Sequence, residues 1–122
     1  MKFCWSTLHV KDMSESLAFY QEIVGLNVVR RFNAGPDTEI AFLGDGETKI
    51  ELICDANRQE INIGNDISWG FTVDSVDKMM RVIQAKGLKI HEGPFQPNPQ
   101  VKFFYVLDPD GLRIQFVENI ET

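Results

Sequence analysis

A hairpin pattern that occurs twice is the feature that most constrains this chain. Residues 107–118 read LDPDGLRIQFVE, and the DPDG at 108–111 predicts a tight turn, because proline fixes one corner and glycine accepts the positive φ that closes it. The residues after the turn alternate as in a strand. A weaker copy lies earlier, with residues 40–43 and 49–53 on either side of the GDG at 44–46. The repetition implies a duplicated supersecondary unit.

Each half of the chain shows the same order of predicted elements, a strand, a helix and then three strands. In the first half we expect a strand at 2–10, a helix at 15–24, a strand at 26–32 and the first hairpin. In the second half we expect a strand at 67–73, a helix capped by Ser75 or Asp77, a strand at 88–91, a Pro-rich loop at 92–100 and the second hairpin. The predicted organisation is a first repeat at 1–55, a polar linker at 56–66 and a second repeat at 67–122.

Corresponding positions in the two halves keep a nearly constant spacing. Trp5 and Ser68 are 63 residues apart (68 − 5), and Glu51 and Gln115 are 64 apart (115 − 51). A period of this length is too long for a solenoid. We therefore predict an α+β fold, in which two β-α-β-β-β repeats form a curved mixed sheet around a cleft, with the helices outside.

Composition argues against two classes of protein. The 12 Lys and Arg residues against 18 Asp and Glu give a net charge of −6 without any basic run, so a nucleic-acid partner is not expected. The longest wholly apolar run, at 103–107, is too short to span a membrane, and the N-terminal MKFCWSTLHV lacks the apolar region of a signal peptide. Cys4 and Cys54 lack a CxxC spacing, and we expect both to be reduced in a cytoplasmic protein.

The first predicted strand carries candidate ligand-binding residues. Trp5, Thr7 and His9 are spaced by two and are predicted to share the face toward the cleft. The indole of Trp5 would offer a stacking surface for a planar ligand, and a simple core role is the alternative. Trp69 is expected on the opposite face of its strand, in the core. Within the FFY run at 103–105, the sequence leaves open which residues line the cleft.

Two phrases in the sequence carry a resemblance to a known family. VKDMSESLAFYQEIVGL at 10–26 and DPDGLRIQF at 108–116 resemble the vicinal oxygen chelate superfamily, which contains glyoxalase I, bleomycin-resistance proteins, fosfomycin-resistance enzymes and extradiol dioxygenases. The resemblance covers nearly the whole chain, including the duplicated order of elements. It specifies the fold more closely than the function, because this fold hosts several chemistries and also plain binding proteins.

The resemblance also implies where a metal would be held. In the family, a divalent metal is bound from the first and last strand of each half, commonly by His or Gln, Glu, His and Glu. These positions fall on Trp5, Glu51, Ser68 and Gln115, and only Glu51 is a good ligand. His9 does not replace Trp5, because four residues along a strand cover about 13 Å. We therefore expect no metal site and no cofactor.

Three of these four positions allow more than one role. Glu51 is either a carboxylate that is solvated or paired with Lys49 or Arg113, or a general base if it is partly desolvated. Ser68 and Gln115 are either neutral polar fillers or hydrogen-bonding groups for a ligand.

The predicted function is that of a glyoxalase-like or bleomycin-resistance-like protein that binds a small aromatic or amphipathic molecule without a metal. The expected ligand-binding residues are Trp5, Thr7, His9, Glu51, Ser68 and Gln115. The alternative is a metal-dependent lyase of the lactoylglutathione lyase (glyoxalase I) type, with Glu51 as its catalytic residue, and a purely structural or regulatory module is a third reading. The sequence leaves open whether the chain is an enzyme. Short members of the family usually pair, so a homodimer is expected.

Overall fold

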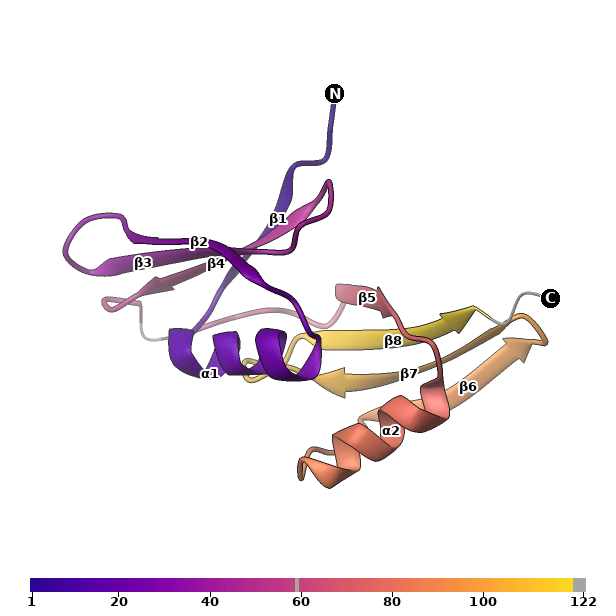
Figure 1. The fold of residues 1–122 in the computed structure, drawn as a ribbon. Helices are drawn as coiled ribbons and strands as arrows, with labels where there is room; N and C mark the ends of the chain where they lie inside the picture. The colour runs from indigo at the N-terminus through magenta and orange to yellow at the C-terminus, as the bar shows by residue number, and fades with distance from the viewer. Residues whose placement is uncertain (59, 120–122) are drawn as a thin grey trace. The chain divides into compact units, whose positions relative to one another are not determined.

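The chain divides into two compact units, Met1–Asn62 and Ile63–Thr122. The structure is a computed structural model that describes residues 1–58 and 60–119. Each unit contains one four-stranded mixed sheet and one helical segment (Figure 1). The prediction of an α+β fold with a duplicated β-α-β-β-β order is thereby confirmed. Within the described residues, no helix is long and apolar enough to cross a membrane.

The first unit places its first and last strands side by side. Its elements are β1 (Trp5–His9), α1 (Met13–Ala18), a π-helical turn η1 (Phe19–Ile23), β2 (Val28–Asn33), β3 (Thr38–Leu43) and β4 (Lys49–Asp55). The strand order is β1-β4-β3-β2. β1 runs parallel to β4, whereas the β2–β3 and β3–β4 pairs are antiparallel. Residues from the two ends of the repeat therefore meet across one strand pair.

One face of this sheet is covered by the helical segment. The helix begins at Met13, two residues earlier than predicted, because a carboxylate oxygen of Asp12 accepts a hydrogen bond of 3.0 Å from the backbone N–H of Glu15. α1 lies against β4. On one face of the strands, the buried apolar residues are Leu8, Ala41, Leu43, Ile50 and Leu52. Because side chains alternate along a strand, the residues between them point to the opposite face, which is not covered by α1.

The second unit repeats this arrangement. Its elements are β5 (Ser68–Thr72), α2 (Val76–Ala85), β6 (Glu92–Asn98), β7 (Val101–Leu107) and β8 (Arg113–Asn119), and the strand order is β5-β8-β7-β6. β5 runs parallel to β8, and α2 lies against β7 and β8. The buried core of this unit includes Ile83, Phe104, Val106, Ile114 and Phe116. The residues that alternate with Ile114 and Phe116 along β8 point to the opposite face of the sheet, away from α2.

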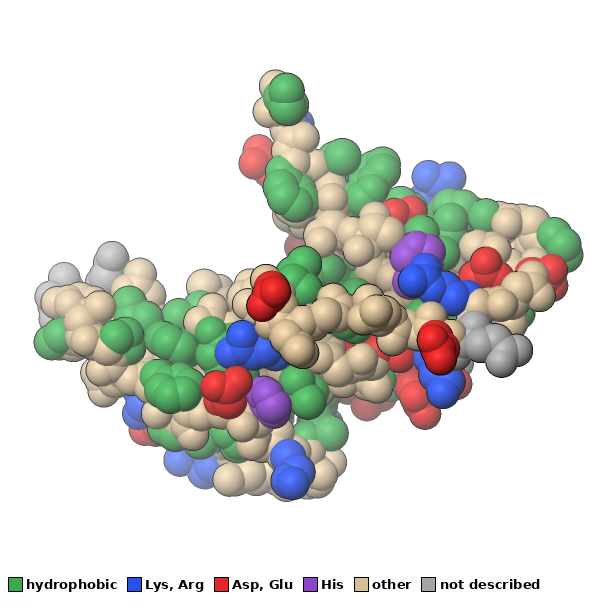
Figure 2. Space-filling model, turned by 180° about the vertical axis from the view of Figure 1, so that it is seen from behind, with side chains coloured by type: hydrophobic (Ala, Val, Ile, Leu, Met, Phe, Trp, Pro, Cys, Tyr) green, Lys and Arg blue, Asp and Glu red, His purple; other side chains and the backbone are tan. Residues whose placement is uncertain are grey.

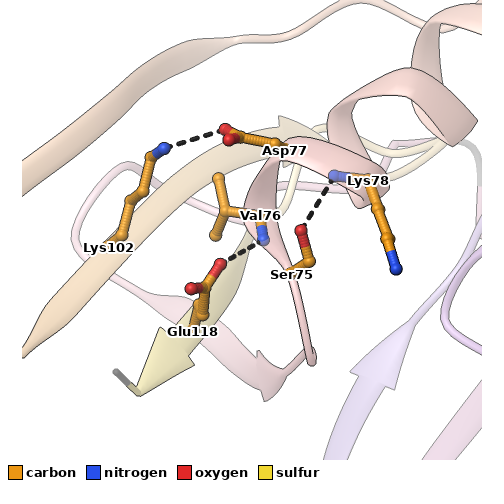
Figure 3. A network of polar contacts seen from close by, with 6 residues as sticks. All are labelled: Ser75, Val76, Asp77, Lys78, Lys102 and Glu118. Carbon is orange, nitrogen blue, oxygen red and sulfur yellow. Dashed lines mark hydrogen bonds and ion pairs between the residues drawn. The ribbon is translucent and has the colours of Figure 1, made fainter. Parts of the chain in front are cut away.

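Helix α2 is fixed to its sheet at its N-terminus (Figure 3). The hydroxyl of Ser75 accepts a hydrogen bond of 3.2 Å from the N–H of Lys78, as predicted for a cap. A carboxylate oxygen of Glu118, on β8, accepts one of 2.6 Å from the N–H of Val76. The ammonium of Lys102, on β7, lies 2.8 Å from the carboxylate of Asp77. Its hydrogen bond and its charge hold the pKa of Asp77 below the usual value. The start of α2 is thus tied to two strands, to β8 through Glu118 and to β7 through Lys102.

The turn between β7 and β8 is closed by the first residue of the DPDG sequence. One carboxylate oxygen of the buried Asp108 accepts hydrogen bonds of 2.9 Å from the N–H groups of Asp110 and Leu112. Gly111 has φ +95°, a conformation that only glycine adopts without strain. The predicted hairpin therefore forms, and it sets the register that pairs Tyr105 with Gln115.

The prediction for residues 88–100 was wrong. The structure has no strand at 88–91, and the predicted Pro-rich loop at 92–100 instead forms strand β6 over Glu92–Asn98. Pro94 and Pro97 lack the N–H that a central strand needs, but β6 lies at the edge of its sheet, where only one side must pair. Its pairing with β7 is interrupted by register shifts around the prolines. Proline here marks an edge strand rather than a loop.

Candidate functional site

The face of the first sheet opposite to α1 brings together Trp5, Thr7, His9 and Glu51. In the parallel pair of β1 and β4, Thr7 lies opposite Glu51, and its hydroxyl donates a hydrogen bond of 2.6 Å to a carboxylate oxygen of Glu51. Leu8 and Leu52, the alternate residues, are buried on the helix side. Neither Lys49 nor Arg113, the two partners considered from the sequence, is the observed partner of Glu51.

Trp5 lies at the start of this face and is not a core residue. The residue is 47% exposed, and its ring meets that of Phe42 edge to face, with 5.3 Å between the ring centroids. Phe42 lies opposite Glu51 in the β3–β4 pair and is buried. The two rings therefore form an apolar corner, with one wall fixed and the other accessible.

A hollow of about 500 Å³ opens beside this corner. Its lining consists of Lys2, Cys4, Trp5, Val29, Arg30, Phe42, Glu47 and Lys49. The volume is within the range of small-molecule sites, roughly 300–1,000 Å³. Neither Lys49 nor Arg30 was predicted from the sequence to be part of a site. Lys49 carried a usable signal, because it lies two residues before Glu51 and so shares its strand face.

His9 occupies the other end of β1. It lies opposite Ile53, and its side chain is half-buried. Its Nδ1 atom is buried and, within the described part of the chain, has no hydrogen-bond partner. A buried polar atom without a partner is costly, so this nitrogen is a position where a ligand or water would be stabilised.

The corresponding face of the second sheet carries Ser68 and Gln115. The amide nitrogen of Gln115 donates a hydrogen bond of 3.3 Å to the hydroxyl of Tyr105. Gly70 lies opposite Gln115, where an added Cβ would be only 3.1 Å from the Gln115 amide oxygen. Ser68 is exposed at the start of β5, opposite Arg113. Phe103 and Tyr105 are therefore the residues of the FFY run on this face, and the fully buried Phe104 points the other way.

Arg113 is a functional candidate that was predicted only as an alternative partner for Glu51. Its guanidinium lies over the ring of Tyr105, 4.2 Å from the centroid, and 3.2 Å from a carboxylate oxygen of Glu92. The same oxygen is 3.5 Å from Nε2 of His91. The Nε atom of Arg113 is buried without a partner among the described residues. Glu92 belongs to β6, which was predicted to be a loop, so this cluster could not be predicted from the sequence.

The predicted residues thus form two groups. Trp5, Thr7, His9 and Glu51 lie on the sheet of the first unit, and Ser68 and Gln115 lie on the sheet of the second. Trp69 pairs with Ile114 and shares its helix-side face. Among the residues that the structure describes, no three His, Cys, Asp or Glu side chains lie together as a group that could hold a metal ion.

Comparison with known proteins agrees with the duplicated fold. The family model described as "Glyoxalase/Bleomycin resistance protein/Dioxygenase superfamily" matches residues 3–116. The lactoylglutathione lyase of Haemophilus influenzae is 30% identical over 131 aligned residues, which cover 100% of this chain and 96% of the relative. That of Neisseria meningitidis is 31% identical, covering 98% and 91% of the two chains.

Solved structures are similar at the level of the fold. The trypanothione-dependent glyoxalase I of Leishmania major superposes with a TM-score of 0.83 at 21% identity, covering 97% of this chain and 86% of its own. A glyoxalase family protein from Bacillus cereus gives a TM-score of 0.84 at 20% identity, covering 99% and 95%. Similarity at this level of identity concerns the arrangement of the elements and not the chemistry.

Proposed function

The chain belongs to the glyoxalase/bleomycin resistance protein/dioxygenase superfamily, and we propose that it is a member that binds a small organic molecule without the metal that the family commonly uses. The observation that carries the proposal is the apolar corner of Trp5 and Phe42, which stands where the resemblance assigns the first metal ligand. A half-exposed indole against a buried phenyl ring is suited to holding a planar ligand.

The residues at the four metal positions do not fit a metal ion. The indole of Trp5 offers only an N–H donor, which cannot ligate. Glu51 offers a carboxylate, one oxygen of which already accepts the Thr7 hydroxyl. Ser68 and Gln115 supply only a neutral hydroxyl and a neutral amide, which bind divalent cations more weakly than His or Glu. We therefore assign no reaction step to a metal in this protein.

Each predicted ligand-binding residue has a specific role in this proposal. In the first unit, Trp5 would stack on the ligand, while Thr7, His9 and Glu51 would supply polar contacts. In the second unit, Ser68 and Gln115 would offer a hydroxyl and an amide on their own sheet face. Neutral groups of this kind fix the orientation of a ligand rather than supplying most of its affinity.

A second candidate function is supported by the curated relatives. Several proteins named lactoylglutathione lyase match nearly the whole chain at about 30% identity. Under this alternative the chain would be a metal-dependent lyase, with Glu51 as a metal ligand or a general base. The alternative is less well supported, because one carboxylate without strong companion ligands makes a weak metal site.

The proposal includes a homodimer in the cytoplasm with no nucleic-acid partner. On the face shown in Figure 2, Lys and Arg side chains are interspersed with Asp and Glu rather than gathered into a basic patch. Both cysteines, Cys4 and Cys54, are free thiols, as a reducing compartment would keep them. Light scattering tests the dimer, and a mass near the single-chain 13.9 kDa at all micromolar concentrations would refute it.

The central proposal is tested by metal binding and by ligand screening. The purified protein should show no stoichiometric site when titrated with Ni²⁺, Zn²⁺ or Mn²⁺, and no lactoylglutathione lyase activity with any of them. A thermal-shift screen of small molecules should identify ligands, because a ligand present at 100 times its Kd adds about 2.7 kcal/mol to the free energy of unfolding. Tight metal binding that Glu51→Gln abolishes would instead establish the lyase-type alternative.

A further inference from the structure

The hollow beside Trp5 has a charge opposite to that of the whole protein. Lys2, Arg30 and Lys49 line it against the single carboxylate of Glu47, which gives a local balance of +2 (3 − 1) in a chain of net charge −6. Among the described residues, none of these three cations forms an ion pair. Their charge is therefore free to act on a ligand.

Two of the three cations are held on the sheet beside the aromatic corner. Lys49 lies directly opposite Trp5 in the β1–β4 pair. Arg30 lies opposite Phe42 in the β2–β3 pair, and its guanidinium sits over the ring of Phe32, 4.5 Å from the centroid. A cation–π contact of this kind restricts the guanidinium and leaves its N–H groups able to bind an anion.

The carboxylate of Glu51 does not cancel this positive charge. It is absent from the lining of the hollow, and one of its oxygens accepts the Thr7 hydroxyl. Glu51 is two residues beyond Lys49 along β4, which is a distance of about 7 Å. The face therefore has an aromatic and cationic end around Trp5 and a separate acidic position at Thr7 and Glu51.

We propose that the hollow selects a planar aromatic anion, such as a ring that carries a carboxylate. This inference rests on the proposed small-molecule function and narrows it to a ligand class. The ring stacks on the exposed face of Trp5 against the fixed wall of Phe42, and the anionic group reaches Lys49 and Arg30. Charge-assisted hydrogen bonds are roughly twice as strong as neutral ones, so the charge should contribute strongly to selectivity.

A matched series of naphthalene compounds tests the ligand class. The three probes are 2-naphthoate, 2-naphthamide and 2-naphthylmethylammonium, which keep the ring and change the charge from negative to neutral to positive. Isothermal titration calorimetry should give the tightest binding for the naphthoate and the weakest for the ammonium compound. Lys49→Gln and Arg30→Gln should each weaken naphthoate binding by about tenfold, the scale of one charge-assisted hydrogen bond, and should leave naphthamide binding nearly unchanged. Lys86→Gln, after the end of α2, is the control.

The two cysteines report where the probe binds. Cys4 lines the hollow and is exposed, whereas Cys54 lies outside the lining, with its thiol 3.6 Å from the carbonyl of Lys11. Naphthoate should slow alkylation of Cys4 by iodoacetamide, measured by mass spectrometry, and should not change the rate at Cys54. Lys49→Gln should remove this protection at a fixed probe concentration.

The possible results distinguish a wrong ligand class from a wrong small-molecule function. Equal affinities for the three compounds, or tighter binding of the ammonium compound, would overturn the assignment of an anion while the small-molecule site at Trp5 stands. If no naphthalene compound binds, the aromatic ligand class is wrong, whereas the proposed function falls only if the broader thermal-shift screen also finds no ligand.

Discussion

The hydroxyl of Thr7 is hydrogen-bonded to the carboxylate of Glu51 across the parallel pair of β1 and β4, at 2.6 Å. This contact joins the first strand of the repeat to its last. It also orients the only carboxylate that the four family metal positions retain. The local geometry of the candidate site therefore depends on two residues 44 positions apart in the sequence.

Replacing Thr7 by Val should lower the free energy of unfolding by about 0.5–1.5 kcal/mol, the net value of one hydrogen bond. Valine keeps the branched shape but has a different strand propensity, so the single variant alone is not decisive. A double-mutant cycle with Glu51→Ala, measured by urea unfolding, removes this contribution. Additive effects of the two substitutions would show that the hydrogen bond does not contribute to the free energy of unfolding.

The two tryptophans should differ in their access to solvent. Trp5 is 47% exposed, whereas Trp69 lies on the helix-side face of β5 and is half-buried. The Trp69→Phe variant, which keeps Trp5, should show stronger fluorescence quenching by acrylamide than the Trp5→Phe variant. A ligand from the thermal-shift screen should reduce quenching only in the protein that keeps Trp5. If the ligand protects Trp69 instead, the site is not on the face proposed here.

Much of the fold could be predicted from the sequence, because both halves of the chain carry a hairpin with turn-forming residues. The DPDG turn and the alternation in β8 predicted the second hairpin, and the apolar spacing predicted both helical segments. Strand β6 was missed because proline is a loop signal in a central strand but is tolerated at an edge. Whether a strand lies at an edge depends on the order of the strands in the sheet, which local sequence does not contain.

The candidate site was predictable only along single strands. A spacing of two placed Trp5, Thr7 and His9 on one face. The contact of Trp5 with Phe42 and the approach of Arg30 depend on β3 and β2, whose register includes an irregularity between Val28 and Arg30. A one-residue slip reverses the faces of a strand, so such pairings are read from the structure and not from the sequence.

Three glycines allow a matched test of the packing in the second unit. An added Cβ at Gly93 would lie 3.0 Å from the Cβ of the buried Phe104, and Gly93 has φ +103°. Gly111 has φ +95° with open space around it, and Gly46 has open space without a positive φ. Gly111→Ala should therefore cost only backbone strain, about 1–3 kcal/mol, while Gly93→Ala should cost more and Gly46→Ala close to nothing.

Thermal unfolding of these three variants ranks the effects. The order of stability should be Gly46→Ala, then Gly111→Ala, then Gly93→Ala. If Gly93→Ala were as stable as Gly111→Ala, the close approach of β6 to Phe104 would be refuted.

The ion pair at the start of α2 should make stability depend on acid. The hydrogen bond and charge of Lys102 lower the pKa of Asp77 from its ordinary value of 3.8. A carboxylate whose pKa is lower in the folded state binds protons more weakly there than in the unfolded chain. Its contribution is therefore complete at neutral pH, and it is lost as the pH falls below 3.8 and through the lower folded value.

Urea unfolding at neutral pH and at about pH 3 measures this contribution. Lys102→Met should destabilise the protein at neutral pH and should make less difference at the lower pH, because protonated Asp77 no longer pairs with the ammonium. Both side chains are partly exposed, so salt should weaken the effect. NMR titration of the Asp77 carboxyl should show its pKa rise in Lys102→Met and stay unchanged in Lys86→Met, a control beyond the end of α2. An Asp77 pKa that does not respond to Lys102→Met would show that the pair shown in Figure 3 does not persist in solution.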